Sequence, residues 1–345
     1  MQLGIIGSGS WATALAKIVT DNGNNIHWWV RNETILQHLK QRKHNPNYLS
    51  SASFEVSKLH LYTSLAEMVP NCDVIIIAVP SAYIGETFSV LDEKVLEGKL
   101  VISAVKGMMP DQNILLNEWL ANRFGVPLSD YYTIMGPCHA EEVARERLSY
   151  LTISGSSEEK ASELASYFNT WYINTVVNDD VLGVQYAAVL KNIYALGAGI
   201  AHGLEYGDNF QSVFIANCAD EMAAFLKKVG VHYRDVGSHQ NENPHTKRKD
   251  ANYAASVYLG DLLVTCYSLY SRNRTFGNMI GKGYPVMSAL LEMNMVAEGY
   301  NASRSIYNLN QQVKAEMPIA TAIYEILWKQ LLPGEGFRRI EQVLI

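Results

Sequence analysis

The sequence lacks closely spaced cysteines, long apolar runs and an excess of basic charge, and each absence argues against a class of protein. Its four cysteines lie far apart with no CxxC spacing, which argues against a disulfide framework and a zinc knuckle. The densest apolar run, Val74 to Val79, has six residues, whereas a membrane helix needs roughly 20. The 28 basic and 34 acidic residues give a formal charge of −6, which offers no broad electrostatic surface to a nucleic acid.

The length and the start of the chain narrow the class further. With 345 residues, of which 48% are hydrophobic, the chain is long enough for two domains with large cores. A strand-like segment begins at Leu3, which leaves no room for a signal or transit peptide. We therefore expect a cytoplasmic protein that neither spans a membrane nor binds nucleic acid.

The first half of the chain alternates short apolar runs with helical patterns. Strands are expected over residues 3–7, 25–30, 74–79, 100–104, 132–135, 150–154 and 175–177, and helices over 11–20 and 158–168. This alternation predicts a parallel sheet that is covered by helices on both faces.

Helical patterns dominate from Val181 onward, which places a domain boundary near residue 180. The predicted fold class is therefore α/β, with a sheet domain over 1–180 and an all-helical domain over 181–345. A polar stretch at about 231–254, rich in His, Asn and Lys, interrupts the helical pattern. We expect it to be an exposed loop or an insertion.

A glycine-rich turn follows the first expected strand. Residues Gly7 to Ala12 fit the pattern G-x-G-x-x-G/A and open a helix. In such a turn Gly7 permits the sharp bend, Gly9 lets backbone N–H groups approach a pyrophosphate, and Ala12 keeps helix and strand close. The anion then rests on the helix N-terminus. The motif predicts a dinucleotide site, and the alternative is a glycine turn with a purely structural role.

The end of the second expected strand bears on the choice of nucleotide. An NAD-preferring site carries an acid there for the ribose 2′-hydroxyl, but this chain has Arg31. A guanidinium suits a 2′-phosphate, which would make NADPH acceptable. The alternative is a solvated arginine at a strand end, and the nearby Glu33 keeps NADH possible.

One charged residue interrupts an otherwise apolar helical pattern. Lys191 is the only acidic, lysine or arginine residue between Val181 and His202, and a buried ammonium without a partner is costly. It should therefore border a cavity or meet a carboxylate, where its pKa can be tuned for proton donation beside a carbonyl. The alternative is a lysine whose chain reaches out to solvent.

A second polar cluster lies further along the helical half. Asp261 and Thr265 are spaced i, i+4 and therefore share a helix face. Arg272 and Asn273 offer a charged fork and an amide, of the kind that binds a phosphate. The same residues could equally form a solvated turn.

Together these motifs resemble the NAD(P)-dependent glycerol-3-phosphate dehydrogenase family. The resemblance covers most of the chain, and its markers occur in the family's order: 7–16, 45–49, 78–81, 104–107, 136–142, 190–192, 207–209, 260–262, 271–274 and 298–299. It implies a Rossmann-type doubly wound NAD(P)-binding domain, an all-helical substrate-binding domain and a site between them. It also implies interconversion of dihydroxyacetone phosphate and sn-glycerol 3-phosphate with NAD(P)H and no metal. Such an enzyme supplies glycerol 3-phosphate for phospholipid synthesis.

The resemblance assigns roles position by position. Lys191 would be the proton donor and acceptor, with Lys106 and Asp261 orienting it and the substrate oxygens. The substrate would be bound by Lys106, Gly136, Cys138, Lys191, Asn192, Asp261, Thr265, Ser271, Arg272 and Asn273. The cofactor would be bound by Gly7, Gly9, Ser10, Trp11, Arg31, Lys106, Ala140, Arg272, Val296 and Glu298. Cys138 departs from the family, which usually has serine after Gly-Pro.

Several alternatives remain. A hydrolase using Cys138 and His139 is disfavoured because adjacent residues rarely present nucleophile and base to each other. Histidines 232, 239 and 245 are loosely spaced for a metal, and the basic run 247–249 is short for RNA binding. The stronger rivals are a dehydrogenase of another small hydroxy acid or phosphorylated polyol, and a nucleotide-binding relative without activity. The helical half is rich in aromatic residues, and the whole chain has twenty tyrosines, which favours a homodimer.

Overall fold

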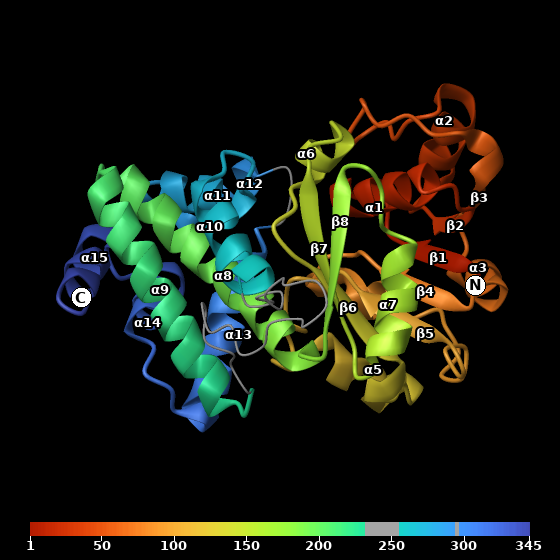
Figure 1. Ribbon diagram of the computed structural model, residues 1–345. Coiled ribbons are helices and arrows are strands. Elements are labelled where there is room, and N and C mark those ends of the chain that lie inside the picture. Colours follow the sequence, from red (N-terminus) through yellow and green to blue (C-terminus); the bar gives the residue numbers. More distant parts are fainter. Residues whose placement is uncertain (232–254, 294–296) are drawn as a thin grey trace, which may run out of the picture. The chain divides into compact units, whose positions relative to one another are not determined.

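The computed structural model describes residues 1–231, 255–293 and 297–345. The chain forms two compact units (Figure 1). Unit 1 contains Met1–Val105 and Ile114–Val181, and unit 2 contains Lys106–Asn113 and Leu182–Ile345. The short segment Lys106–Asn113, which the sequence-based boundary assigns to the first domain, thus belongs to unit 2. The expected insertion at 231–254 lies outside the described residues, apart from Val231.

Unit 1 is built on one eight-stranded sheet with the strand order β3-β2-β1-β4-β5-β6-β7-β8. The strands are β1 (Leu3–Ile6), β2 (Ile26–Trp29), β3 (Leu59–Tyr62), β4 (Val74–Ile77), β5 (Leu100–Ser103), β6 (Tyr131–Met135), β7 (Ser149–Ser154) and β8 (Ile173–Asn178). Every pair is parallel except β6 and β7, which are antiparallel. The expectation of an all-parallel sheet is therefore wrong at this one pair, because strand direction depends on a connection that apolar runs do not encode.

The central strands of this sheet are buried on both faces. All four residues of β1 and of β4 are buried, as expected for parallel strands between helical layers. The helices of unit 1 are α1 (Ser10–Asp21), α2 (Glu33–Arg42), α3 (Leu65–Met68), α4 (Ile84–Phe88), α5 (Leu116–Phe124), α6 (Ala140–Ala144) and α7 (Glu158–Ser166). Strand β3 and helices α2, α4, α5 and α6 are not among the elements expected from the sequence.

The described part of unit 2 is mainly helical, and its segment Lys106–Asn113 forms turns. The helices are α8 (Val181–Gly203), α9 (Asp208–Lys228), α10 (Asp261–Tyr267), α11 (Arg272–Gly281), α12 (Val286–Glu292), α13 (Glu298–Val313), α14 (Pro318–Trp328) and α15 (Pro333–Glu341), with a π-helical turn over Ala255–Gly260 before α10. Helix α8 is buried along most of its length. It approaches α11 so closely that a Cβ on Gly277 would overlap the carbonyl oxygen of Leu196.

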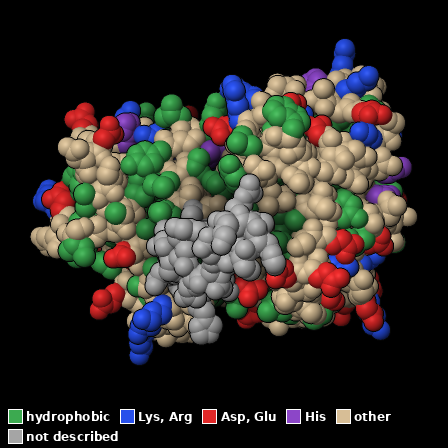
Figure 2. Space-filling model, in the orientation of Figure 1, with side chains coloured by type: hydrophobic (Ala, Val, Ile, Leu, Met, Phe, Trp, Pro, Cys, Tyr) green, Lys and Arg blue, Asp and Glu red, His purple; other side chains and the backbone are tan. Residues whose placement is uncertain are grey.

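Three features of the described residues concern membrane helices, cysteines and surface charge. No helix in the described ranges is long and apolar enough to cross a membrane. The four cysteines are free and buried. On the face drawn in Figure 2, basic and acidic side chains of the described residues are interspersed.

Candidate active site

Unit 2 brings the predicted proton donor and its carboxylate together. Lys191 lies in the middle of α8, and Asp261 is the first residue of α10. Lys191 Nζ forms an ion pair with Asp261 Oδ1, and the two side chains are 4% and 2% exposed. The lysine therefore does not reach out to solvent, and the expectation that it meets a partner is confirmed.

A second ammonium faces the same carboxylate. Lys106 Nζ lies 3.9 Å from Asp261 Oδ2, and Oδ2 accepts no hydrogen bond from the residues that the structure describes. Burial is the largest effect on the pKa of Lys191 and lowers it, Asp261 opposes that shift, and Lys106 adds to it; the resulting pKa is about 8. A lysine with this pKa can exchange between the ammonium and the neutral amine near neutral pH, as a general acid–base group must.

Thr265 fixes the start of α10 beside this pair. Its hydroxyl donates to the backbone oxygen of Asp261 at 2.5 Å and lies 3.4 Å from Asp261 Oδ1. The i, i+4 spacing noted in the sequence thus places Thr265 against Asp261 itself. One oxygen of the carboxylate is occupied by Lys191 and Thr265, and the other remains available to a hydroxyl group of a ligand.

A chain of amide hydrogen bonds connects three helices to the segment that carries Lys106. Asn192 Nδ2 donates to the backbone oxygen of Lys106 at 2.9 Å. Asn273 Nδ2 donates to Asn192 Oδ1 at 2.9 Å, and the backbone N–H of Gly299 donates to Asn273 Oδ1 at 2.9 Å. A Cβ at Gly299 would overlap the backbone oxygen of Asn192. This series of hydrogen bonds was not predicted from the sequence, because its residues are separated by up to 193 positions and no local pattern links them.

The N-terminus of α11 presents the predicted phosphate ligands. Ser271 is the N-cap, and its hydroxyl accepts a hydrogen bond from the backbone N–H of Arg274 at 3.3 Å. Arg272 and Asn273 are the first two residues of the helix. No acidic residue lies in the first turn, so the helix dipole and the guanidinium both favour an anion there.

Unit 1 contains the glycine-rich turn at the end of β1. Gly7 has φ +134°, and a Cβ there would overlap the backbone oxygen of Ala78. Gly9, the N-cap of α1, faces open space. Ser10 and Trp11 begin the helix, whose first turn has no acidic residue. The turn thus has the backbone freedom and the open helix N-terminus that a pyrophosphate needs.

A buried asparagine holds this turn from behind. Asn45 Nδ2 donates to the backbone oxygen of Ser8 at 3.1 Å and to the hydroxyl of Thr13 at 2.9 Å. Its Oδ1 accepts from the backbone N–H groups of Asn47 and Tyr48. The sequence marks 45–49 as a family motif without a role, and the structure makes Asn45 the support of the glycine turn.

The other predicted cofactor and substrate residues of unit 1 lie after β2 and after β6. Arg31 is exposed at the carboxyl end of β2. Gly136 has φ +135° and packs against the backbone oxygen of Tyr150, and Ala140 begins α6. The thiol of Cys138 donates to the same oxygen of Tyr150 at 3.1 Å. The thiol of Cys138 is thus hydrogen-bonded to a backbone carbonyl and not to a base, which does not support the alternative of a hydrolase that uses Cys138 and His139.

Comparison with known proteins decides the family. The N-terminal model of the NAD-dependent glycerol-3-phosphate dehydrogenase family matches residues 2–161, and its C-terminal model matches residues 180–337. The chain belongs to this family. It is 32% identical to the glycerol-3-phosphate dehydrogenase (NAD(P)+) of Chlorobium chlorochromatii over 331 residues. The alignment covers 95% of this chain and 94% of that one. The Bacillus subtilis enzyme of the same name is 33% identical over 325 residues, or 94% of this chain and 89% of that one.

A solved member of the glycerol-3-phosphate dehydrogenase family has the same fold. The crystal structure of the Coxiella burnetii enzyme superposes with a TM-score of 0.84 at 25% identity and covers 99% of this chain and 98% of that one. These matches confirm the predicted family, the α/β fold class with a Rossmann-type sheet, and the class of NAD(P)-dependent dehydrogenase.

Some predicted residues fall outside this account. Val296, the three histidines 232, 239 and 245, and the basic run 247–249 lie outside the described residues. Glu298, expected at the cofactor, is the first residue of α13 and precedes Gly299 in unit 2. Within the described ranges no three His, Cys, Asp or Glu side chains are placed to hold a metal ion.

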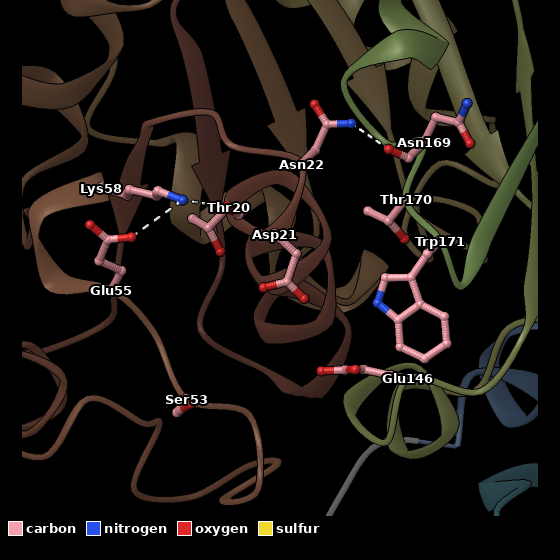
Figure 3. A pocket seen from close by; sticks show the side chains of 10 residues that line it. All are labelled: Thr20, Asp21, Asn22, Ser53, Glu55, Lys58, Glu146, Asn169, Thr170 and Trp171. Carbon is pink, nitrogen blue, oxygen red and sulfur yellow. Dashed lines mark hydrogen bonds and ion pairs between the residues drawn. The ribbon is translucent and has the colours of Figure 1, made fainter.

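A cavity of about 530 Å³ in unit 1 involves none of the family residues. Figure 3 shows its polar lining, which comes from Thr20, Asp21, Asn22, Ser53, Glu55, Lys58, Glu146, Asn169, Thr170 and Trp171. Lys58 Nζ lies 3.4 Å from a Glu55 oxygen and donates to the backbone oxygen of Thr20 at 3.1 Å (Figure 3). The cavity lies at the carboxyl end of α1, one helix length from the glycine turn, so it is not the nucleotide site.

Proposed function

We propose that the protein reduces dihydroxyacetone phosphate to sn-glycerol 3-phosphate with NAD(P)H, and catalyses the reverse reaction. The observation that carries the proposal is the buried pair of Lys191 and Asp261, with Lys106 facing the same carboxylate. Family membership supports the substrate and the cofactor. The alternatives are a dehydrogenase of another small hydroxy acid or phosphorylated polyol, and a nucleotide-binding relative without activity. The N-terminus of α11, with Arg272 in its first turn, favours a phosphorylated substrate over a hydroxy acid.

The glycine turn of unit 1 fits the pyrophosphate of a dinucleotide. Backbone N–H groups at the start of α1 and the open side of Gly9 would receive it. Ser10, Trp11 and Arg31 would contact the rest of the nucleotide, with Ala140, Lys106, Arg272, Val296 and Glu298 as the family's further cofactor residues. When bound, the reduced nicotinamide supplies the hydride that adds to the ketone carbon.

Lys191 would supply the proton. As hydride reaches the ketone carbon, negative charge develops on the ketone oxygen, and the Lys191 ammonium donates its proton to that oxygen. In alcohol oxidation the neutral amine takes the proton back. Asp261 holds Lys191 in place, and the second ammonium, on Lys106, stabilises the developing alkoxide. The oxygen Asp261 Oδ2, which accepts no hydrogen bond from the described residues, is free to accept one from a substrate hydroxyl.

The substrate phosphate would rest on the N-terminus of α11. Arg272 provides the charged fork, and Ser271 and Asn273 hold the first turn in position. Asn192 and Thr265 would orient the groups around the lysine pair, and Gly136 and Cys138 complete the family's substrate set.

The test is direct assay of the purified protein and its Lys191→Ala variant. We expect loss of reduced-nicotinamide absorbance only when dihydroxyacetone phosphate is added to the wild type. Removing a general acid typically costs about 10²–10⁴-fold in rate, so Lys191→Ala should be nearly inactive while it still binds NADPH. Lys228→Ala, an exposed lysine of α9, is the matched control and should retain full activity. Near-normal turnover by Lys191→Ala would overturn the assignment of the proton donor.

Three further features belong to the proposal. Glycerol 3-phosphate is the backbone of phospholipids, so the enzyme would supply phospholipid synthesis. Four free, buried cysteines suit the reducing environment of the cytoplasm. The exposed apolar side chains of Leu269, Met287 and Leu291 in unit 2 suit a homodimer contact. Light scattering during size-exclusion chromatography would test the dimer.

A further inference from the structure

A buried carboxylate away from the reacting groups connects three helices of unit 2. Glu221 lies on α9 and is 6% exposed. Its Oε2 accepts the backbone N–H of Ile319 at 2.7 Å, and its Oε1 accepts the backbone N–H of Ala320 at 2.9 Å. The hydroxyl of Tyr194, on α8, donates to the same Oε1 at 3.1 Å. Both oxygens of the carboxylate are thus occupied by fixed donors.

The two N–H groups belong to the first turn of α14. That helix begins at Pro318, and its own N-cap residue, Met317, makes no side-chain hydrogen bond to it. The first N–H groups of a helix have no partner within the helix, and the helix dipole favours an anion beside them. Glu221 therefore caps α14 from a neighbouring helix, and this cap ties α9 firmly to the backbone of α14.

Tyr194 extends this anchor to the helix of the proton donor. It is fully buried on α8 and lies three residues after Lys191, so the two side chains are about one helical turn apart. Between Ala187 and Ala201 the only polar side chains are those of Lys191, Asn192 and Tyr194. The rest of this stretch packs by apolar contact, which is not directional and so fixes the rotation of a helix less sharply than hydrogen bonds do.

Two of these three polar side chains bind groups of the candidate site itself, Asp261 and the backbone of Lys106. Tyr194 is the one whose partner lies elsewhere. We infer that Glu221 is a positioning residue for catalysis: through Tyr194 it sets the rotation of α8 and thereby the place of Lys191 Nζ beside Asp261. This inference rests on the proposed function, and it adds a residue that neither touches substrate nor belongs to the predicted site.

The surroundings of Glu221 define the conditions of the test. Burial raises the pKa of Glu221 to about 7, and the three donors oppose that shift. The titratable groups around it are Tyr194 on α8 and Cys218 on α9, and burial raises the pKa of both. The pH profile is therefore read above the pKa of Glu221, where the carboxylate is ionised.

The first variant is Tyr194→Phe, which keeps the ring and removes only the hydroxyl. Glu221 retains its two backbone donors, so we expect the fold to be preserved. A displacement of the reacting group by about 1 Å can cost up to about 100-fold in rate, and we expect kcat to fall by about tenfold or more. The affinity for NADPH should not change. The basic limb of the pH profile should move by about half a unit or more, because the burial and ion pairing that set the pKa of Lys191 change.

The second variant is Glu221→Gln. Its side-chain NH₂ group replaces one carboxylate oxygen, so one backbone N–H of α14 would face a donor and lose its acceptor. This variant should show the same loss of kcat and the same change of pH profile. If Glu221 acts through Tyr194, the double variant is no slower than the slower single variant, because residues in one hydrogen-bond network are not additive. Tyr324→Phe, a buried tyrosine of α14 that stacks on Tyr307, is the matched control and should keep kcat and pH profile.

Unchanged kcat and pH profile in Tyr194→Phe would overturn the inference, whatever happens to the thermal stability, since a purely structural role lowers Tm alone. Because that variant keeps both backbone bonds of Glu221, this result remains decisive even if Glu221→Gln fails to fold. An inactive wild type would instead refute the proposed function. An active wild type with two unaffected variants would refute only the role of Glu221.

Discussion

Lys191 and Asp261 form an ion pair between α8 and α10 that is almost completely removed from solvent. Replacing a buried ion pair with well-packed apolar side chains is often neutral or stabilising, because desolvation of two charges offsets much of their attraction. The pair is therefore poorly explained as a means of stabilising unit 2. It is better explained by chemistry, since burial and a neighbouring ammonium lower the pKa of Lys191 into the range where proton transfer is efficient.

The pH dependence should differ between the two directions of the reaction. Ketone reduction needs the ammonium form of Lys191, whose pKa is lowered to about 8. Its kcat should fall about tenfold per pH unit above that pKa. Alcohol oxidation needs the neutral amine, so its kcat should rise up to about the same pH and then level off. Steady-state rates in both directions across this range are the measurement, and identical profiles in the two directions would contradict the assignment.

Arg272 at the start of α11 should determine the affinity for the phosphate group. A charge-assisted hydrogen bond contributes roughly 1.5–3 kcal/mol, so Arg272→Ala should raise KM for dihydroxyacetone phosphate by about 10–100-fold. The activity with dihydroxyacetone, which has no phosphate, should fall far less, and only through the contact that Arg272 is expected to make with the cofactor. Arg338→Ala, an exposed arginine of α15, is the control. An unchanged KM for the phosphorylated substrate would reject this role.

Local patterns in the sequence were sufficient for much of unit 1. The glycine turn could be predicted because a sharp bend with φ +134° at Gly7 requires glycine whatever surrounds it. The buried strands β1 and β4 could be predicted because they are continuous apolar runs. Strand β3 could not, because Leu59–Tyr62 is partly exposed at the edge of the sheet and contains His60. Its hydrogen bonds to β2 make it a strand, and apolar periodicity does not.

The candidate site likewise has residues that local sequence patterns reveal and residues that only the fold reveals. A lone lysine on an apolar helix predicts a buried partner, but only the fold identifies that partner as Asp261, 70 positions along the chain. The roles of Asn45 and of Glu221 depend on backbone groups that are distant in sequence, at Ser8 and at Ile319. A residue that supports others through long-range hydrogen bonds leaves no local pattern, whereas a residue that breaks an apolar pattern does.

Asn45 should be needed for nucleotide binding because it supports the glycine turn. Asn45→Ala removes two donated and two accepted hydrogen bonds in a fully buried position. The free energy of unfolding should fall by about 2 kcal/mol or more, and the Kd for NADPH should rise. Asn71→Ala, whose amide makes a single exposed bond to the backbone of Glu67, is the control. Calorimetry and NADPH titration give both quantities, and a lower Tm with unchanged Kd would limit Asn45 to a structural role.

The close contact of α8 and α11 should tolerate no side chain at Gly277. A Cβ there would overlap the backbone oxygen of Leu196 and lie 3.0 Å from the backbone nitrogen of Ile200, and both atoms belong to the helix that carries Lys191. Because neither can move without shifting α8, Gly277→Ala should lower the free energy of unfolding by about 3 kcal/mol or more and reduce kcat. Gly334→Ala makes the same change in α15, where a Cβ meets nothing within 4 Å. It should be neutral or stabilising by up to about 1 kcal/mol. Thermal unfolding of both variants is the measurement, and equal Tm values would show that α8 and α11 can separate without cost.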